Sequence, residues 1–367
     1  MEPQDVDKQE IGLAVFSDRS ASHRLGLVFC AVISIASLGW AVDVYRELGL
    51  SFMNEQFFAV VLAMALPAVL LIYRADYSEP GQSAPIQDWL LALAGFVNGI
   101  YVAIWYPDIL DRLYTSPTDA VIAGSIFIAL IAEGLRRTAG KVLFSFLVFF
   151  VLFGFFSHYL PFNFRGEEVS YARYAVFLGL DSNGLLGLAL KVSTTMIVAF
   201  LLFGFVLEKS GGAEFFTDLS KSLVGHKRGG SAKIAIVASS LFGSISGSAV
   251  SNVVSTGVVT IPLMRKSGYS KEHSAGVEAV ASTGGQLMPP MMGIAAFLMA
   301  EILHLPYSEI VVAAIIPALL YYIALFSHVD LLAVRDKINP LPISEMSRPG
   351  PVFRQGWLFF IPFLVII

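Results

Sequence analysis

Residues 239–290 read SSLFGSISGSAVSNVVSTGVVTIPLMRKSGYSKEHSAGVEAVASTGGQLMPP. Small polar residues interrupt the apolar segments of this stretch twice, at Gly243–Ser248 and at Ser282–Gln286. A helix broken in this way leaves backbone N–H and C=O groups without partners, which hydrocarbon tolerates only where protein encloses a wet cavity. Paired interruptions in a membrane protein therefore predict a substrate or ion site.

The composition is that of a membrane protein. Of the 367 residues, 56% are hydrophobic and only 14% are charged, whereas soluble domains carry about 25% charged residues. The mean hydropathy is +0.71, and we predict an all-α polytopic membrane protein. The net charge of -4 does not suggest a nucleic-acid partner, and the single Cys30 excludes both an intramolecular disulfide and a cysteine-based metal cluster.

A spanning helix needs about 20 mainly apolar residues. The early segments that approach this length are Leu25–Val42, Phe57–Tyr73, Trp89–Tyr106, Ala120–Leu135, Lys141–Tyr159 and Gly184–Leu207. Lys and Arg are concentrated in alternate connections, which predicts that the polar tail 1–24 is cytoplasmic. The long connection Leu160–Asn183 then faces the outside. An amphipathic segment, Ala213–Leu223, is expected to lie along the cytoplasmic surface of the lipid bilayer.

The interrupted region predicts two unusual elements. Residues 231–242 and 249–264 are each short for a bilayer crossing, and both outer ends are basic. We therefore expect a re-entrant hairpin over 231–266 that enters and leaves from the cytoplasm, with its tip at Gly243–Ser248. We expect a broken transmembrane helix over 271–303, interrupted at 283–290, because Pro289 and Pro290 forbid a continuous helix.

The remaining chain predicts one helix over 310–329 and a cytoplasmic loop over 330–356. Residues 357–367 are apolar but too few to span a bilayer. We therefore expect them to be the start of a truncated transmembrane helix.

Three motifs in this region carry a family resemblance: SISGSAVSNVVSTGVVTIPLMRKSGY (244–269), EAVASTGGQLMPPMMGIAAFLMAE (278–301) and PALLYYIAL (317–325). They resemble the large membrane subunit of the tripartite ATP-independent periplasmic (TRAP) transporters. The similarity is greatest to the fused permease that works with TAXI-type binding proteins. Residues 25–137 look like the fused four-helix small subunit, and residues 141–230 look like scaffold helices with an interfacial arm helix.

The resemblance implies a sodium-coupled secondary importer of the elevator type, a symporter in the bacterial inner membrane. A TAXI-type periplasmic substrate-binding protein delivers a small organic acid to it, and Na⁺ is the coupling ion. The family has two halves in inverted repeat, and this chain contains only the first. The second hairpin and half of the substrate site are therefore unaccounted for.

Carbonyl groups freed at helix ends can supply oxygen ligands to sodium. The expected ligands, mainly through backbone carbonyls, are Gly243, Ser246, Gly247, Gly284, Gly285 and Met288. The alternative is that the small residues only allow tight helix packing. Glu278, on the helix that enters the second break, could neutralise sodium or serve as a hydrogen-bonding residue.

Hydroxyl and amide donors near the breaks could hold the substrate carboxylate. The candidates are Ser246, Ser248, Asn252 and Thr283. If Asn252 serves the substrate, Asn252→Ala should weaken transport more than sodium binding. Its alternative role is an interhelical hydrogen bond. No arginine lies in these segments to clamp an acid.

Two other functions fit parts of the pattern. A channel would show flux without saturation or coupling. An intramembrane serine hydrolase could use Ser246, but no base is evident, and Ile245 occupies the middle of Gly243–Gly247, so the Gly-x-Ser-x-Gly motif is absent. We expect no enzyme activity, no catalytic residues and no cofactor other than the coupling ion.

Overall fold

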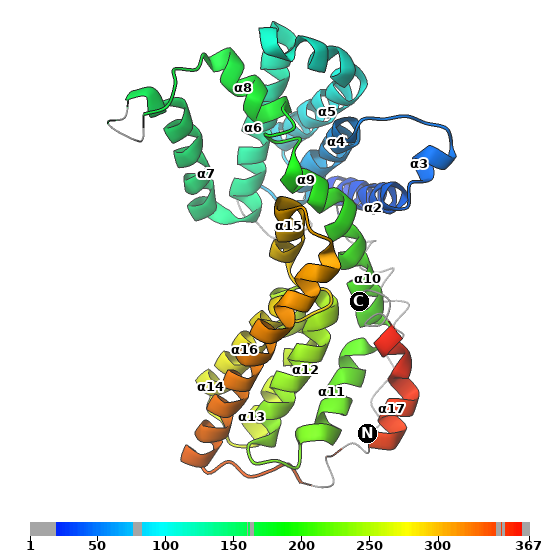
Figure 1. Cartoon of the computed structure of the whole chain (residues 1–367), viewed down its shortest axis with the longest axis vertical. Coiled ribbons are helices and arrows are strands. Elements are labelled where there is room, and N and C mark those ends of the chain that lie inside the picture. Colours follow the sequence, from blue (N-terminus) through cyan, green and yellow to red (C-terminus); the bar gives the residue numbers. More distant parts are fainter. Residues whose placement is uncertain are drawn as a thin grey trace. The chain divides into compact units, whose positions relative to one another are not determined.

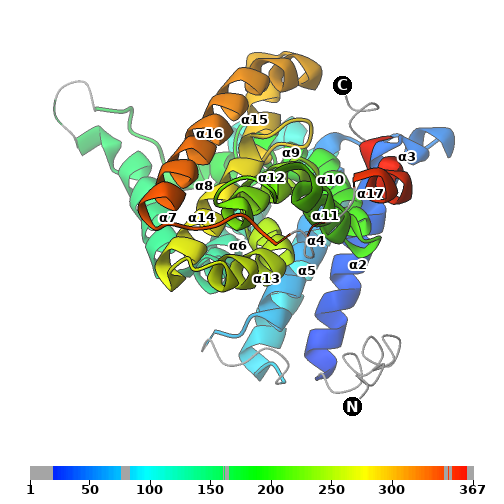
Figure 2. The same cartoon turned by 90° about the horizontal axis from the view of Figure 1, so that it is seen from below.

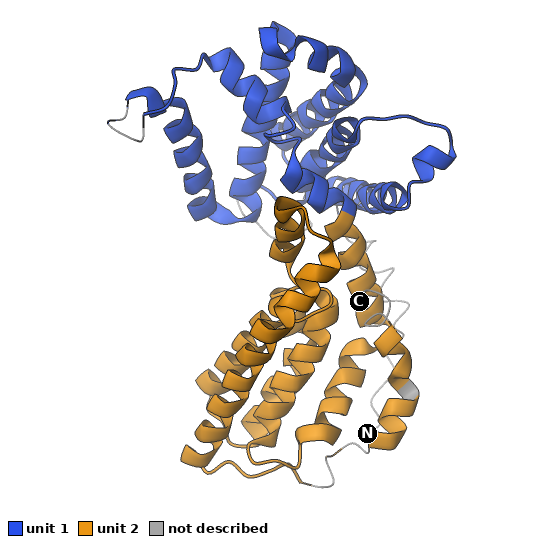
Figure 3. Cartoon of the chain, viewed as in Figure 1, with its two compact units in different colours: residues 1–195 blue, residues 196–367 orange. Residues whose placement is uncertain are grey.

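The computed structural model describes residues 20–75, 83–159, 161, 165–342, 346 and 349–361. It divides into two compact units, residues 1–195 and 196–367, which Figure 3 shows in blue and orange. The described residues form helices and no strand. Within these described ranges, six helices are long and apolar enough to cross a membrane, which confirms the predicted polytopic helical architecture.

Unit 1 is built on α4, which packs against α2, α5 and α6. Its helices are α2 (Ala21–Ala41), α3 (Val44–Glu47), α4 (Asn54–Ile72), α5 (Ile86–Arg112), α6 (Thr118–Thr138), α7 (Gly140–Phe155), α8 (Tyr171–Leu180) and α9 (Leu188–Val192). Close approach of α4 and α5 depends on Gly99, because a Cβ there would lie 2.6 Å from the Cβ of Ala63.

A buried ion pair links three helices of unit 1. The Arg137 guanidinium donates to the Asp88 carboxylate at 2.8 Å and to Glu133 at 2.7 Å. It also donates to the carbonyls of Leu70 and Tyr73. One side chain thereby ties α4, α5 and α6 together, since Asp88 lies in the first turn of α5.

The connection predicted over Leu160–Asn183 contains a helix, α8, which is a correction. Ser170 begins it, because its hydroxyl accepts a hydrogen bond from the Arg173 amide. The helix buries Ala175 and Gly179 against α6, where Gly124 allows the backbones to touch. A helix of 10 residues is too short to have been recognised as a span.

The sixth predicted span also differs from the structure, because it begins at Leu188 and not at Gly184. Gly184 and Gly187 lie in a turn, where a Cβ on Gly187 would meet the Ser182 carbonyl at 2.2 Å. A π-helical turn, η4 (Ser193–Ile197), follows α9 and leads into α10 (Val198–Lys209).

In unit 2, α12 packs against α11, α13 and α14, and α16 runs alongside α14 (Figures 1 and 2). The further helices are α11 (Gly212–Val224), α12 (Gly230–Ser246), α13 (Ala249–Lys266), α14 (Lys271–Gly284), α15 (Ile294–Leu303), α16 (Tyr307–Arg335) and α17 (Pro349–Gly356). Short 3₁₀ turns occur at η5 (Gly285–Leu287) and η7 (Trp357–Phe360). Phe215 and Phe216 of α11 pack on the aromatic rings of η7.

The ends of these elements correct several predicted bounds. The helix predicted over 310–329 runs from Tyr307 to Arg335, so it occupies the start of the loop predicted over 330–356, and α17 occupies the loop's end. Pro306 precedes the first turn of α16, where its missing N–H costs nothing. Residues 357–360 form a 3₁₀ turn, and residues 362–367 and 1–19 lie outside the described residues.

Candidate ion and substrate site

A two-residue turn joins α12 to α13, and it is narrower than the tip predicted over Gly243–Ser248. Residues 243–246 are still helical. Gly247 ends α12 in the left-handed region at φ +59°, and its amide donates to the Gly243 carbonyl at 2.9 Å. Ser248 then begins α13, because its hydroxyl accepts a hydrogen bond from the Ser251 amide. The chain reverses direction at Gly247–Ser248.

The second interruption continues to Gly293, beyond its predicted end at Pro290. After α14 and η5, residues 288–293 are not helical, and α15 begins only at Ile294. This segment lies against the end of α12, where the Met291 amide donates to the Ser244 carbonyl at 3.0 Å. The two interruptions therefore meet.

Glycine on both sides allows this contact. A Cβ on Gly243 would lie 2.5 Å from the Gly285 Cα, and one on Gly285 would lie 2.7 Å from the Gly243 Cα. Real Cβ atoms do not approach so closely, so any larger residue at either position would push α12 and η5 apart. The predicted Gly243 and Gly285 thus lie side by side, backbone to backbone.

A small cavity of about 30 Å³ opens beside the turn. It is lined by Ser246, Gly247, Met291 and Met292, together with the apolar side chains of Ile197, Phe200, Leu201, Ile294 and Phe297. A Cβ on Gly247 would lie 2.5 Å from the Met291 carbonyl oxygen and 2.8 Å from that of Met292. Both carbonyl oxygens therefore lie close to the backbone of the turn.

Ser246 is the residue lining this cavity that carries a side-chain oxygen. Its hydroxyl is buried and has no hydrogen-bond partner among the described residues, although buried hydroxyls are normally paired. A cavity needs roughly 10–15 Å³ to hold one water molecule, so this one has room for a water or a single small ion. It is too small for an organic acid.

Three predicted residues lie away from this cavity. Gly284 faces α16, because a Cβ there would lie 2.3 Å from the Tyr321 ring. Thr283 is exposed, and its hydroxyl donates to the Ala279 carbonyl of its own helix. Met288 is half-buried against the apolar cluster of α12–α16. The sequence reading missed Met291 and Met292, although their position directly after Pro290 was a usable signal.

Asn252 is fully buried one turn after the hairpin tip. Its amide nitrogen donates to the Ser239 carbonyl of α12 at 2.8 Å and to the Ser282 carbonyl of α14 at 3.4 Å. The amide therefore joins three helices. This geometry favours the interhelical hydrogen bond over a direct substrate contact.

Glu278 is also fully buried, and hydroxyl groups surround its carboxyl group. Ser239 of α12, Thr256 and Thr260 of α13, and Ser282 of α14 all lie within hydrogen-bond distance of it. This cluster, the Glu278 cage, lies on the same three helices that Asn252 joins.

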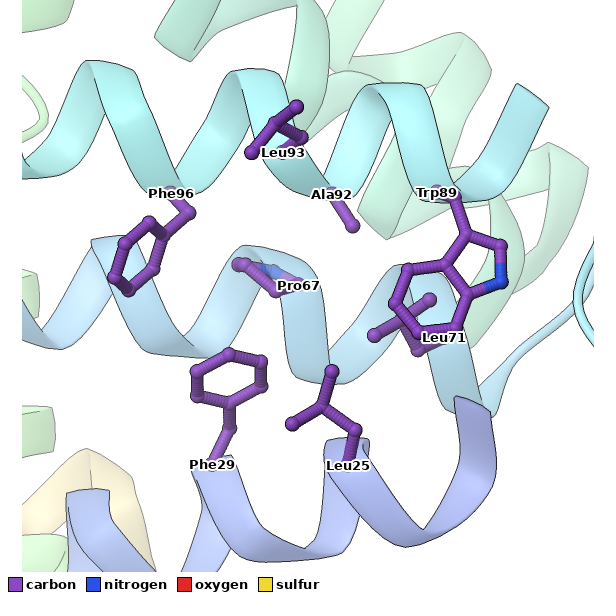
Figure 4. Close-up of a pocket in the computed structure, with 8 residues that line it drawn as sticks. All are labelled: Leu25, Phe29, Pro67, Leu71, Trp89, Ala92, Leu93 and Phe96. Atoms are coloured by element: carbon purple, nitrogen blue, oxygen red, sulfur yellow. The ribbon is translucent and has the colours of Figure 1, made fainter. Parts of the chain in front are cut away.

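A larger cavity of about 160 Å³ lies in unit 1 between α2, α4 and α5 (Figure 4). Its lining side chains are apolar apart from the indole N–H of one tryptophan: Leu25, Phe29, Pro67, Leu71, Trp89, Ala92, Leu93 and Phe96. It presents no cationic group to an organic acid, so we do not place the substrate there.

Residues 125–367 match the family model of the tripartite ATP-independent periplasmic transporter DctM component. The chain belongs to this family. The match begins within α6 and includes both the hairpin and the broken helix. The family consists of transporter permeases and not of enzymes, and the apolar helices agree with a multi-pass membrane protein.

Several TRAP permease proteins are similar to part of this chain. The chain is 30% identical over 163 residues to the sialic acid TRAP transporter permease protein SiaT of Haemophilus influenzae, covering 44% of this chain and 26% of the relative. It is 31% identical over 132 residues to the C4-dicarboxylate TRAP transporter large permease protein DctM of Pseudomonas aeruginosa, covering 36% and 30%. It is 26% identical over 162 residues to the 2,3-diketo-L-gulonate TRAP transporter large permease protein YiaN of Escherichia coli, covering 44% and 38%.

The chain thus spans between about a quarter and two fifths of these relatives. The predicted fusion to a small subunit over 25–137 and the TAXI type stay predictions.

Proposed function

We propose that this chain forms the ion-binding half of a sodium-coupled secondary importer that takes up a small organic acid. The contact between the Gly247 turn and the Met291–Met292 segment carries this proposal. It places one unpartnered buried hydroxyl and two carbonyl oxygens beside a small, mostly apolar cavity of ionic size. Oxygen ligands at broken helix ends are the arrangement by which transporters hold sodium.

Sodium is the ion that suits this cavity. The C-terminal end of α12 carries partial negative charge, and the carbonyls of Met291 and Met292 add neutral oxygen ligands. The candidate ligands are therefore the Ser246 hydroxyl, the carbonyls of Met291 and Met292 and the carbonyls at the end of α12. Gly243 and Gly285 contribute by close packing, since each carbonyl already accepts a backbone hydrogen bond.

The organic acid would bind outside the ion cavity, near the N-termini of α13 and α15. The N-termini of α13 and α15 both start at this contact, and helix N-termini attract carboxylates. The ion cavity cannot enclose an acid, so the remaining substrate contacts come from another part of the permease. The relatives named for sialic acid, C4-dicarboxylates and diketogulonate support an acidic substrate.

The transport cycle would follow an elevator mechanism, with unit 2 carrying the ion across the bilayer. Helices α12 and α13 have 17 and 18 residues, about 25–27 Å at 1.5 Å per residue, which is short of the roughly 30 Å hydrocarbon core. This length and the basic outer ends support a re-entrant hairpin. We place the protein in the bacterial inner membrane with a cytoplasmic N-terminus, served by a TAXI-type periplasmic binding protein.

A serine hydrolase is disfavoured by the same geometry, because the Ser246 hydroxyl contacts no histidine or lysine among the described residues.

A channel stays the alternative. Uptake into proteoliposomes distinguishes them: the complete transport complex is supplied with its binding protein, a panel of organic acids and an inward sodium gradient. Saturable accumulation that collapses with the gradient supports the proposal. Passive, non-saturable flux without sodium dependence contradicts it and favours a channel.

A further inference from the structure

The apolar cavity of unit 1 takes no part in the proposed ion and substrate sites. Helices α2 and α5 both pack on α4, and the cavity of about 160 Å³ lies between the three (Figure 4). Two short side chains, Pro67 of α4 and Ala92 of α5, lie among the longer ones that line it, which leaves the space between the helices unfilled. All three helices are long and apolar enough to cross a membrane.

Contacts at both ends of the cavity keep α2 in place. At one end, the rings of Phe29 on α2 and Phe96 on α5 have their centroids 6.0 Å apart and close the cavity (Figure 4). Towards the other end, α2 already touches α4, because a Cβ on Gly26 would lie 2.6 Å from Cγ1 of Ile72. Helix α2 therefore cannot move closer to α4 to fill the space.

The cavity opens between α2 and α5. Its floor is α4, whose lining residues Pro67 and Leu71 are buried. The lining residues of α5 include two exposed ones, Trp89 at 39% and Leu93 at 59%. Because exposed apolar side chains on a membrane-spanning helix face the hydrocarbon, the cavity is continuous with the lipid-facing surface of unit 1.

The size and lining of the cavity restrict what can fill it. A buried water molecule needs two to four polar partners, and the lining side chains offer one polar group, the indole N–H of Trp89. A helix with its side chains is about 10–12 Å across, so it cannot enter. Dry apolar cavities of about 150 Å³ take up molecules as large as benzene. A segment of a single hydrocarbon chain therefore fits.

The Trp89 end of the cavity lies towards the membrane interface. Trp89 is in the first turn of α5, directly after Asp88, which pairs with Arg137 at 2.8 Å. Tryptophans at the ends of spanning helices lie at the level of the lipid headgroups. From Trp89 the cavity runs to the ring of Phe96, seven residues further along α5, or about 10 Å deeper. A lipid chain would enter from the headgroup level in this direction.

We propose that this cavity binds one acyl chain of a membrane phospholipid, with the headgroup on the Trp89 side and the chain directed towards Phe29 and Phe96. The acyl chain enters between α2 and α5 and provides the dispersion contacts that the lining side chains otherwise lack. No covalent bond forms or breaks. The proposal requires that unit 1 spans the bilayer, and it does not depend on the sodium site.

Quenching of tryptophan fluorescence tests the proposal in dodecyl maltoside micelles, with phosphatidylglycerol brominated on its acyl chains as the probe. One variant keeps Trp89 as its only tryptophan, through Trp40→Phe, Trp105→Phe and Trp357→Phe. The matched control keeps only Trp105, which is 51% exposed on the same helix and does not line the cavity. Trp89 should be quenched saturably, with one lipid per chain, whereas quenching of Trp105 should rise in proportion to the brominated lipid. Equal behaviour of the two tryptophans, or an unquenched Trp89, would overturn the proposal.

A second measurement decides the question if the single-tryptophan variants do not fold. Native mass spectrometry counts the phospholipids that remain on the purified chain after washing with detergent. The wild type should keep one, and Ala92→Phe should lose it because the new ring fills the cavity. Ala94→Phe is the control, since Ala94 is exposed on α5 and does not line the cavity, and it should keep the lipid. A wild type without lipid, or equal retention in Ala92→Phe, contradicts the proposal. Neither measurement uses sodium or an organic acid, so its failure is distinct from failure of the uptake assay.

Discussion

The backbone amide of Met291 donates a hydrogen bond to the Ser244 carbonyl across 3.0 Å. This bond pairs two backbone groups that the helix interruptions leave without helical partners: a carbonyl at the end of α12 and an amide in the segment before α15. It also holds the Met291 and Met292 carbonyls beside Gly247. The ion cavity therefore needs both interruptions, and changes on either side should damage it.

Replacing Gly243 with alanine should separate the two interruptions. The new Cβ would lie 2.5 Å from the Gly285 Cα and 2.8 Å from the Asn252 amide nitrogen, an overpacking that costs about 1–3 kcal/mol. We expect a lower melting temperature in detergent and strongly reduced sodium-driven uptake. Gly276→Ala is the matched control, because a Cβ there has no neighbour within 4 Å. Equal behaviour of the two variants would mean that the close packing is unimportant.

Ser246→Ala should weaken sodium binding without destabilising the protein. The hydroxyl is buried and unpartnered among the described residues, so its removal loses no protein hydrogen bond and leaves folding stability equal or higher. A titration of sodium binding should show an affinity loss of about tenfold, the value of one such ligand at about 1.4 kcal/mol.

The control for this variant is Ser244→Ala, since the Ser244 hydroxyl donates to the Leu241 carbonyl of its own helix at 2.6 Å. It should leave sodium affinity unchanged. Unaltered sodium affinity in Ser246→Ala would remove this hydroxyl from the ligand set.

Asn252→Ala should reduce sodium binding and substrate transport together. The amide nitrogen joins α12 and α14 through the Ser239 and Ser282 carbonyls, and loss of a buried hydrogen bond costs about 1–3 kcal/mol. Sodium titration and uptake on the same preparation check this outcome. Selective loss of transport, with sodium binding intact, would instead assign Asn252 to the substrate.

The hairpin and the break were predictable because glycine and proline act locally. Gly247 and the Pro289–Pro290 pair mark the interruptions in the sequence itself. Which residues meet across them was less predictable, because the contact joins positions about 40 residues apart. Thr283 and Gly284 illustrate this: they lie at the expected break, but their directions are set by the helical turn of α14, which points them away from α12.

Glu278 shows the other limit of sequence reading. A single acidic residue on an entering helix has many possible partners, and the four hydroxyls that enclose it come from three helices. Ser and Thr are too common in membrane helices to identify such a cage from spacing alone. Only the packing of α12, α13 and α14 assembles it.

The buried ion pair of unit 1 should dominate the stability of that unit. Arg137→Met would leave the Asp88 carboxylate buried and unpaired, which costs about 3–5 kcal/mol. Arg136→Met removes a half-exposed pair with Glu133 and should cost at most about 1 kcal/mol. Thermal unfolding in detergent measures the difference. If both variants lost the same stability, the buried Arg137–Asp88 pair would matter no more to unit 1 than the half-exposed Arg136–Glu133 pair.

The most direct test of the ion site is a titration of sodium binding in the wild type and Gly247→Val. A side chain at Gly247 meets the Met291 and Met292 carbonyls and is also strained by the φ of +59°. Gly211→Val is the control for strain alone, because Gly211 has φ +94° and no neighbour within 4 Å of a Cβ. We predict saturable sodium binding in the wild type and in Gly211→Val, and none in Gly247→Val although it inserts normally into the membrane. Undiminished sodium binding in Gly247→Val would contradict the account.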